Sequence, residues 1–172
     1  DQILYYARSE NPEKDYFIKD LNLSDIVHKV LLKYRVYLLD EKISVQVHHL
    51  EKKIYTDEKW LIFIISQIIQ NAIKYMDKKE KKIEISASEN KDNVVLLIKD
   101  NGCGIQESDI SRVFEKGFTG SNRGKESSTG IGLYLAKKIC DSLGLTISIE
   151  SIYQKQTIVK IIFPKTNFNK FE

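Results

Sequence analysis

The spacing of hydrophobic and polar residues along the chain predicts six strands and three helices. Apolar and polar residues alternate, as in half-buried strands, over residues 16–23, 42–50, 82–89, 93–100, 145–151 and 156–163. Helical spacing begins after Ser24, which we expect to cap a first helix with the apolar stripe Ile26, Val27, Val30, Leu31, Tyr34 and Leu38. A longer helix is expected over 56–76, with Thr56 or Asp57 as its cap, and a third over 131–144, ended by Gly144.

The order of these elements predicts the fold class. It favours an α/β two-layer sandwich, in which a mixed, mostly antiparallel sheet of about five strands, plus a short hairpin, is covered on one face by three helices. Residues 100–132 form a polar, glycine-rich stretch that is longer than an ordinary connection. We expect the domain to span residues 17–165, preceded over 1–16 by the end of a helix and a linker and followed over 166–172 by a tail.

Composition excludes several classes of protein. The chain has 172 residues, of which 42% are hydrophobic and 30% are charged, as is typical of one soluble globular domain. The 27 basic and 24 acidic residues are interspersed, so we expect no nucleic-acid-binding surface. The longest apolar stretch, residues 61–69, is far shorter than the roughly 18 residues that a membrane-spanning helix needs. The sequence begins with neither Met nor a secretory signal, which suggests a fragment of a longer protein.

The long predicted helix carries a polar stripe near its C-terminal end. On a period of about 3.6 residues, Gln67, Asn71, Lys74 and Tyr75 share one face, while apolar residues cover the rest. The amide oxygen of Asn71 could ligate magnesium, which prefers oxygen ligands, and Lys74 could neutralise a phosphate. The alternative is an ordinary amphipathic helix whose end reaches the surface.

Two glycine pairs add a second kind of signal. The segment "DNGCGI" at 100–105 follows a hydrophobic strand, so Asp100 places an acceptor beside backbone that can approach a flat ligand closely. The segment "STGIGL" at 128–133 opens a helix, where Gly130 and Gly132 leave backbone N–H groups and the positive end of the helix dipole open to an anion such as a polyphosphate. Taken alone, the first pair is equally typical of a tight turn.

The order and spacing of these motifs resemble the ATP-binding fold of the GHKL superfamily (Bergerat fold), which sensor histidine kinases share with DNA gyrase, the heat-shock chaperone ATPase and mismatch-repair ATPases. The similarity covers about residues 20–165 and is most specific to the catalytic domain of sensor histidine kinases: "QNAIKY" resembles its N box, "DNGCGI" its first glycine box, "FEKGF" its F box and "STGIGL" its second glycine box. Residue usage in "YYARSENPEKDY", "FEKGFTG" and "STGIGLYLAKKI" is similar to that of intramembrane-sensing kinases that detect bacitracin or other antimicrobial peptides beside a transporter.

The resemblance implies a role for each matching residue. Asp100 would accept a hydrogen bond from the adenine amino group, with Thr157 supporting the same edge through water. Asn71 would hold Mg²⁺ against the phosphates, and Gln67, Asn71 and Lys74 would be the catalytic residues. The residues expected around ATP are Asn71, Lys74, Tyr75, Asp100, Gly102, Gly104, Ile105, Phe118, Arg123, Lys125, Thr129, Gly130, Ile131, Gly132, Leu133 and Thr157, with Ile98 as a further wall of the adenine pocket. Residues 116–129 would form a lid over the nucleotide.

One position departs from the ATPase branches of the superfamily. Gln67 stands where those branches have a Glu that activates water, and because an amide cannot act as a base, hydrolysis should be slow. The phosphoacceptor also has to be sought elsewhere, since neither His28, followed by "KVLLKY", nor His49, followed by "LEKK", has the context of an acceptor histidine. We expect it in a dimerisation helix upstream, of which residues 1–16 would be the end and linker.

The leading hypothesis is a protein-histidine kinase that transfers the γ-phosphoryl group of Mg-ATP to the upstream histidine, for relay to a response regulator. The resemblance implies that this part is cytoplasmic and monomeric, that the parent is a homodimer in the bacterial membrane, and that a peptide transporter is a candidate partner. Two alternatives stay open: a GHKL-type ATPase or anti-sigma-like serine kinase, and a nucleotide-binding interaction module without kinase activity.

Overall fold

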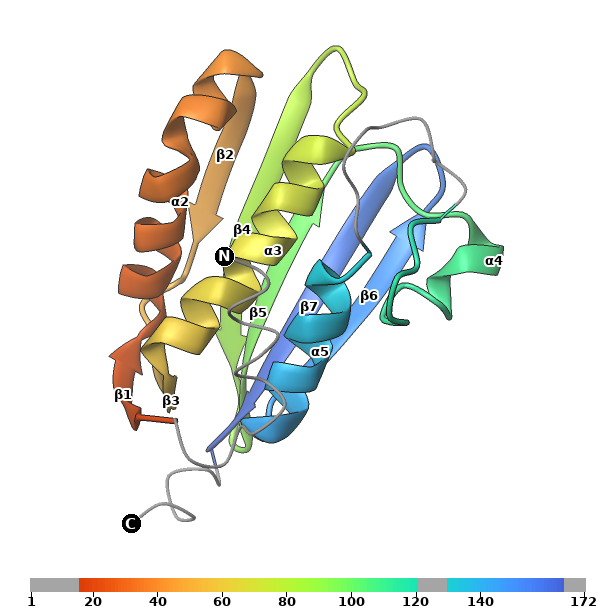
Figure 1. Cartoon of the computed structure of the whole chain (residues 1–172). Coiled ribbons are helices and arrows are strands. Elements are labelled where there is room, and N and C mark those ends of the chain that lie inside the picture. Colours follow the sequence, from red (N-terminus) through yellow and green to blue (C-terminus); the bar gives the residue numbers. More distant parts are fainter. Residues whose placement is uncertain (1–15, 121–129, 166–172) are drawn as a thin grey trace.

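A computed structural model of the chain describes residues 16–120 and 130–165 (Figure 1). The predictions for residues 1–15, 121–129 and 166–172, including most of the expected linker and the tail, fall outside these ranges. In chain order the elements are β1 (Ile18–Asn22), α2 (Leu23–Asp40), β2 (Ile43–His48), β3 (Lys53–Asp57), α3 (Glu58–Lys74), β4 (Lys81–Glu89), β5 (Asn93–Asp100), α4 (Glu107–Ile110), α5 (Gly132–Ser142), β6 (Thr146–Ile152) and β7 (Gln156–Pro164).

Five of the strands form one mixed sheet, in the order β2-β4-β5-β7-β6. The β2–β4 pair is parallel, and the pairs β4–β5, β5–β7 and β6–β7 are antiparallel. Helices α2, α3 and α5 lie side by side across one face of this sheet, as Figure 1 shows. The predicted two-layer α/β sandwich is therefore confirmed.

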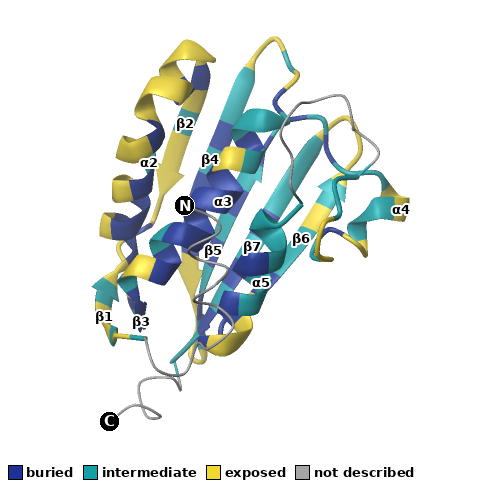
Figure 2. Ribbon diagram, in the orientation of Figure 1, coloured by how far each residue is buried: buried dark blue, intermediate teal, exposed yellow. Residues whose placement is uncertain are grey.

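The core lies between the helices and the sheet, because each layer presents an apolar row to the other (Figure 2). In β5 every second residue is buried, so that Val94, Leu96 and Ile98 point toward the helices. The central helix α3 lies between α2 and α5 and is buried on most of its surface, with Leu61 and Ile65 fully enclosed. Each fully buried side chain of this kind contributes about 1.5–3 kcal/mol to stability.

Several predictions about local structure are wrong. The cap of α2 is Asn22, whose side chain accepts a hydrogen bond from the Ser24 N–H, so Ser24 lies inside the first turn. Strand β3 escaped prediction because its five residues run directly into the cap of α3. It pairs with β1 in a separate antiparallel sheet, so the first predicted strand does not join the main sheet and the small second sheet is not a local hairpin. The short helix α4 interrupts the stretch expected to be irregular.

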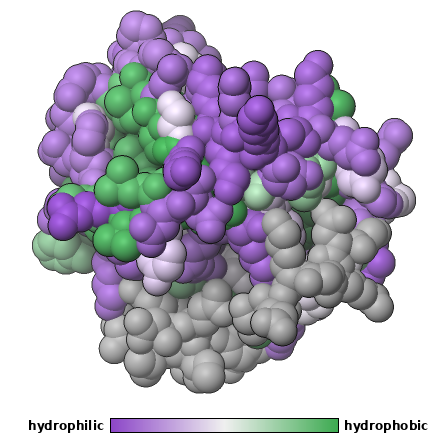
Figure 3. All heavy atoms as spheres, turned by 90° about the horizontal axis from the view of Figure 1, so that it is seen from above, coloured by the Kyte–Doolittle hydropathy of each residue, from purple (hydrophilic) through white to green (hydrophobic). Residues whose placement is uncertain are grey.

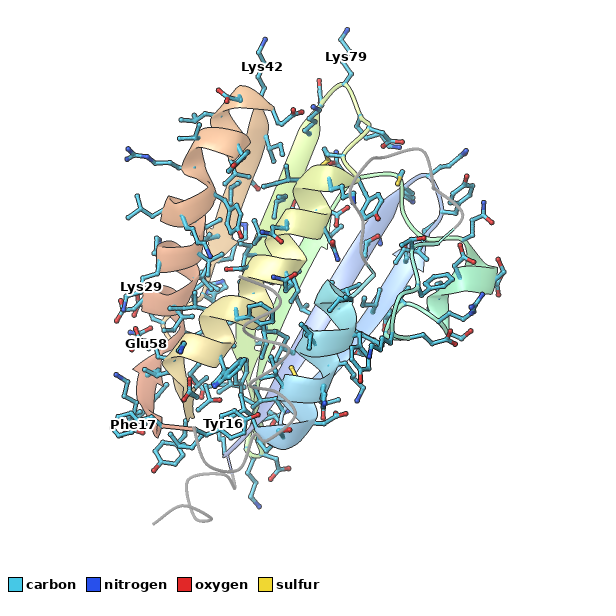
Figure 4. The ribbon with its side chains drawn as sticks, in the orientation of Figure 1. Tyr16, Phe17, Lys29, Lys42, Glu58 and Lys79 are labelled. Carbon is cyan, nitrogen blue, oxygen red and sulfur yellow. The ribbon has the colours of Figure 1, made fainter. Side chains whose placement is uncertain are left out.

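The start of α3 is fixed from two sides. Asp57 caps the helix, as predicted, by accepting a hydrogen bond of 2.9 Å from the Trp60 N–H. Glu58 in the first turn forms ion pairs with Lys19 of β1, at 3.0 Å, and with Lys29 of α2 (Figure 4). These contacts join the small sheet and α2 to the N-terminal end of the central helix.

The end of α5 was also predicted correctly. Gly144 follows the last helical turn with a φ of 71°, which suits glycine because it has no Cβ. The backbone N–H of Leu145 then donates to the Cys140 carbonyl oxygen at 2.8 Å, as in the usual glycine-ended helix.

Hydrophobic atoms are also exposed on one side of the molecule. Seen from above, most of the surface is hydrophilic, and hydrophobic side chains gather over the side on which α2 lies (Figure 3). There Leu32, Val36 and Leu39, spaced along the outer face of α2, are 63%, 57% and 74% exposed. Among the described residues, no helix combines the length and the apolar character that crossing a membrane requires.

Candidate functional site

A cavity of about 360 Å³ lies beside the last turns of α3, between the end of β5, the start of β7 and the start of α5. Most of the residues expected around ATP line it, although they come from distant parts of the sequence. They are Asn71, Lys74, Tyr75, Asp100, Gly104, Ile105, Phe118, Gly130, Gly132, Leu133 and Thr157, and Gln67 lines the cavity as well. Arg123, Lys125 and Thr129 lie outside the described residues.

Three residues expected at the site lie elsewhere. A Cβ at position 102 would lie 2.6 Å from the Tyr75 carbonyl oxygen, so Gly102 serves the packing of its loop against α3 and does not line the cavity. Ile131 packs against the hydrophobic core. Ile98 is only 1% exposed within that core, and Val159 of the neighbouring strand lines the cavity instead.

Sequence reasoning missed several residues of the cavity wall. They are Ile68, Gln70, Ala72, Gln106, Asp109, Val113, Ile149 and Val159, whereas Thr119 and Gly120, which also line the cavity, belong to the segment 116–129 expected as a lid. Alternation along β7 could have found Val159, because it lies two positions from Thr157 and therefore on the same face. Ile149 is the cross-strand partner of Val159, and such pairing depends on a register that the sequence alone does not reveal.

The polar stripe of α3 forms one wall of the cavity. Gln67 is only 6% exposed, while Asn71, Lys74 and Tyr75 are half-buried near the end of the helix. Most of the other α3 residues are buried, although Lys59 and Gln70 are exposed, and this stripe lines the cavity. An amide oxygen and an ammonium group thus face the same space, as a phosphate chain with a bound cation would require.

Asp100 ends the core-facing row of β5 and is therefore buried, with 9% of its surface exposed. Its Oδ1 accepts a hydrogen bond of 2.9 Å from the Gly102 N–H. Burial raises the pKa of the Asp100 carboxyl to about 6, although the Gly102 hydrogen bond lowers it, and the nearby charge of Asp77 raises it further. A carboxylate that has lost its water in this way is a strong acceptor for a ligand that brings a donor hydrogen.

The first glycine box is held between two elements that border the cavity. The Cys103 N–H donates to the Tyr75 carbonyl oxygen at 2.9 Å, which joins the loop to the end of α3. Gly104 has a φ of 67°, and a Cβ there would lie 2.3 Å from the Ile152 carbonyl oxygen at the end of β6. A residue with a side chain at position 104 would therefore force this loop away from the end of β6.

The residues on either side of segment 121–129 contact each other. The Gly117 N–H donates to the Gly130 carbonyl oxygen at 3.0 Å. Gly130 has a φ of 65°, and a Cβ there would lie 2.5 Å from the Gly117 carbonyl carbon. Phe118 lines the cavity at this point, and the Arg112 guanidinium lies 4.5 Å from its ring centroid. The F box and the second glycine box thus meet at the edge of the cavity.

These features together define a class of protein. It is an α/β sandwich with a cavity at the end of α3 and β5 that has the donors and acceptors suited to a purine nucleotide. Residues 56–167 match the family model described as "Histidine kinase-, DNA gyrase B-, and HSP90-like ATPase". Since the match covers well over half of the chain, the chain belongs to this family of ATP-binding domains.

Named relatives point to one branch of the family. The chain is 36% identical over 165 residues to "Sensor histidine kinase YxdK" of Bacillus subtilis (strain 168), which covers 95% of this chain and 51% of that protein. It is 37% identical over 169 residues to "Sensor protein kinase GraS" of Staphylococcus aureus (strain MRSA252), covering 97% and 48%. The chain therefore spans about half the length of the curated relatives it matches.

Solved structures show the same fold. The "Acinetobacter baumannii histidine kinase AdeS" superimposes with a TM-score of 0.74 at 21% identity, covering 95% of this chain and 75% of that chain. The catalytic domain of histidine kinase ThkA gives 0.76 at 20% identity, covering 90% and 99%. Full-length ShkA in complex with AMPPNP gives 0.81 at 16% identity, covering 95% and 34%. The fold is that of histidine kinase catalytic domains.

Proposed function

We propose that this chain is the catalytic part of a sensor histidine kinase and transfers the γ-phosphoryl group of Mg-ATP to a histidine on an upstream dimerisation domain. The observation that supports it best is the convergence of Asp100, the polar stripe of α3 and the two glycine boxes on one cavity of about 360 Å³. The relatives named as sensor histidine kinases favour this branch of the family over its ATPase branches.

Adenine recognition would begin with Asp100. Its carboxylate is buried and accepts a hydrogen bond from the Gly102 N–H through Oδ1, so its remaining lone pairs can accept from the adenine amino group. Thr157 lies directly opposite Asp100 in the β5–β7 register and lines the same cavity. The apolar side chains of Ile105, Leu133 and Val159 would enclose the ring.

The described residues fit a magnesium ion that ATP brings with it. They contain no group of three or more His, Cys, Asp or Glu side chains that could hold a metal by themselves. Mg²⁺ usually takes one or two protein oxygens together with phosphate oxygens and water, so the Asn71 amide would be a sufficient ligand. When bound, the ion would neutralise charge on the phosphates, and the Lys74 ammonium would add a second positive charge.

Gln67 would keep water from competing with the histidine. It lies one helical turn before Asn71 on the same wall and is nearly buried. Its amide can orient a neighbour through hydrogen bonds but cannot remove a proton from water. The site would thus hold ATP ready for transfer while hydrolysing it slowly.

The resemblance and the relatives support further proposals about the whole protein. The chain spans about half of each named kinase. The family resemblance, rather than this coverage, supports an upstream position in the parent for the phosphoacceptor histidine. That parent would be a membrane-bound homodimer, with this domain in the cytoplasm, and would pass its phosphoryl group to a response regulator. The motif resemblance further favours a kinase that senses antimicrobial peptides beside a transporter.

Phosphotransfer in trans tests the proposal. The chain would be mixed with a histidine-bearing dimerisation helix pair taken from one of the relatives, together with Mg²⁺ and ATP labelled in the γ-phosphoryl group. We expect label on the helix pair that is lost in acid, as phosphohistidine is, and none with Asn71→Ala. Acid-stable label would indicate a serine kinase, phosphate release alone an ATPase, and binding without either an interaction module.

A further inference from the structure

We propose that Ser151 determines nucleotide specificity by fixing the hydroxyl of Thr157 as a hydrogen-bond acceptor, so that the site selects the 6-amino group of adenine over the 6-oxo group of guanine. This inference rests on the function proposed above and adds a residue that no sequence motif singled out. Ser151 is not among the residues that line the cavity, so it would act through its neighbour.

The hydroxyl of Ser151 contacts three groups. It accepts a hydrogen bond of 2.8 Å from the Ile105 N–H and donates one of 2.7 Å to the Gln156 carbonyl oxygen. It also lies 3.1 Å from the Thr157 hydroxyl, at a distance where either oxygen could be the donor.

The number of hydrogens on these groups settles the direction of the third contact. A serine hydroxyl has one hydrogen and two lone pairs. The Gln156 carbonyl oxygen can only accept, so the single hydrogen of Ser151 is used there. Thr157 must therefore donate its own hydrogen to Ser151, which saturates the Ser151 hydroxyl with one donated and two accepted bonds.

Thr157 is left with lone pairs only. It lines the cavity and lies directly across from Asp100 in the β5–β7 register. The adjoining carboxylate of Asp100 is an acceptor too, so this corner of the cavity offers two neighbouring acceptors, and the hydroxyl hydrogen of Thr157 is already used. A ligand matches it by bringing hydrogens to both.

Adenine and guanine differ in the group that would face these two acceptors. The 6-amino group of adenine carries two hydrogens, whereas the 6-oxo oxygen of guanine carries none and would face two acceptors. Sites that leave polar groups unpaired against the wrong ligand discriminate strongly. If the Thr157 hydroxyl could rotate, it could donate to the guanine oxygen and remove part of that penalty.

Ser151 also holds the Ile105 backbone, so a purely structural role must be separated from a role in specificity. Loss of a structural support would weaken all nucleotides alike, because Ile105 would contact any ring in the cavity. Loss of the acceptor role would change the ratio of ATP affinity to GTP affinity. The ratio is therefore the quantity to measure.

The experiment titrates the 172-residue chain with Mg-ATP and Mg-GTP by calorimetry. The variants are Ser151→Ala, Thr157→Val, their double mutant and the matched control Ser148→Ala, which lies on the same strand but away from the cavity. Thermal unfolding checks that each variant is folded, and Ser151→Cys, of similar size but with a poor hydrogen-bonding group, replaces Ser151→Ala if that variant does not fold.

We expect Ser151→Ala to lower the ATP-to-GTP affinity ratio by about tenfold, the usual worth of one well-placed hydrogen bond, and Ser148→Ala to leave it unchanged. In the Thr157→Val background, Ser151→Ala should have no further effect on the ratio. Equal weakening of both nucleotides, or a ratio change that persists without the Thr157 hydroxyl, would overturn the role of Ser151. A wild-type chain that binds neither nucleotide, or prefers GTP, would overturn the proposed function itself.

Discussion

Replacing Asp100 by Asn should make the nucleotide-free protein more stable while it destroys adenine recognition. The two side chains have the same shape, and an amide oxygen can accept the same hydrogen bond from the Gly102 N–H. What changes is the charge, which the protein keeps in a position that is only 9% exposed. The substitution therefore isolates the cost of a buried carboxylate.

The pKa of Asp100 gives the size of that cost. Burial raises this pKa from 3.8 to about 6, and because each tenfold change in proton affinity is worth about 1.4 kcal/mol, the ionised carboxylate destabilises the folded state by about 3 kcal/mol. Since the folded pKa is the higher one, the cost is absent below about pH 4, where both states are protonated. The cost grows as pH rises from about 4 to about 6, between the unfolded and the folded pKa, and it has its full size above about 6.

Urea unfolding of both proteins between about pH 4 and pH 7.5 measures this difference. We expect similar free energies of unfolding near pH 4 and a gain of about 2–3 kcal/mol for Asp100→Asn near pH 7.5, less whatever the buried amide costs. Asp92→Asn is the matched control, because Asp92 is an exposed aspartate in the turn at the other end of β5.

The ATP affinity of the same proteins, measured by nucleotide titration, should change in the opposite direction to their stability. The amide NH₂ that Asp100→Asn introduces would face the adenine amino group donor to donor, so we expect ATP affinity at about pH 7.5 to fall by at least about 100-fold. If Asp100→Asn is no more stable than the wild type at that pH, the carboxylate is not desolvated as described. If its ATP affinity is unchanged, Asp100 does not contact the nucleotide.

Three further predictions concern the rest of the site. Gln67→Glu should raise background ATP hydrolysis by at least about tenfold, because it places a base beside the phosphates, and an unchanged rate of phosphate release would contradict the role given to Gln67. Asn71→Ala should leave ATP affinity within about tenfold of the wild type but abolish phosphotransfer to a histidine-bearing helix pair, and retained transfer would show that Asn71 does not hold the metal. Gly130→Ala should weaken ATP binding more than Gly117→Ala does, since both glycines have positive φ but only a Cβ at 130 would meet backbone, at 2.5 Å; equal effects would exclude that contact as the cause.

Two of the four strand pairings in the main sheet were predictable because they join alternating segments that are close in sequence. Strands β4 and β5, and strands β6 and β7, follow each other across short turns, so their pairing needs no long-range information. The polar stripe of α3 was predictable for a similar reason, because the period of the helix alone places Gln67, Asn71 and Lys74 on one face.

The features that could not be predicted from the sequence depend on contacts between distant segments of the chain. Strand β3 is recognisable only through its pairing with β1, a distant segment of the chain, where Leu21 lies opposite Ile54. Ile98 was chosen as a wall of the pocket, but it is enclosed in the core while its cross-strand partner Val159 lines the cavity, and which of two paired side chains reaches a cavity depends on tertiary packing. Ser151 was missed for the same reason, since its role depends on the hydroxyl and backbone groups that the β6–β7 pairing brings to it.

The site lies where the buried apolar rows of β5 and α3 end. This position explains why its polar groups can bind a ligand strongly and why burying them costs stability. Asp100 follows Val94, Leu96 and Ile98 in the buried row of β5, and Gln67 lies on α3 next to buried isoleucines. The Asp100 carboxylate in particular loses most of its water, so a ligand that supplies a donor hydrogen is bound there more strongly than it would be at the surface. The buried apolar residues behind these polar groups supply the stability that burying the polar groups costs. Core substitutions near the cavity should therefore lower the stability of the fold first, and should affect nucleotide selectivity only through that loss of stability.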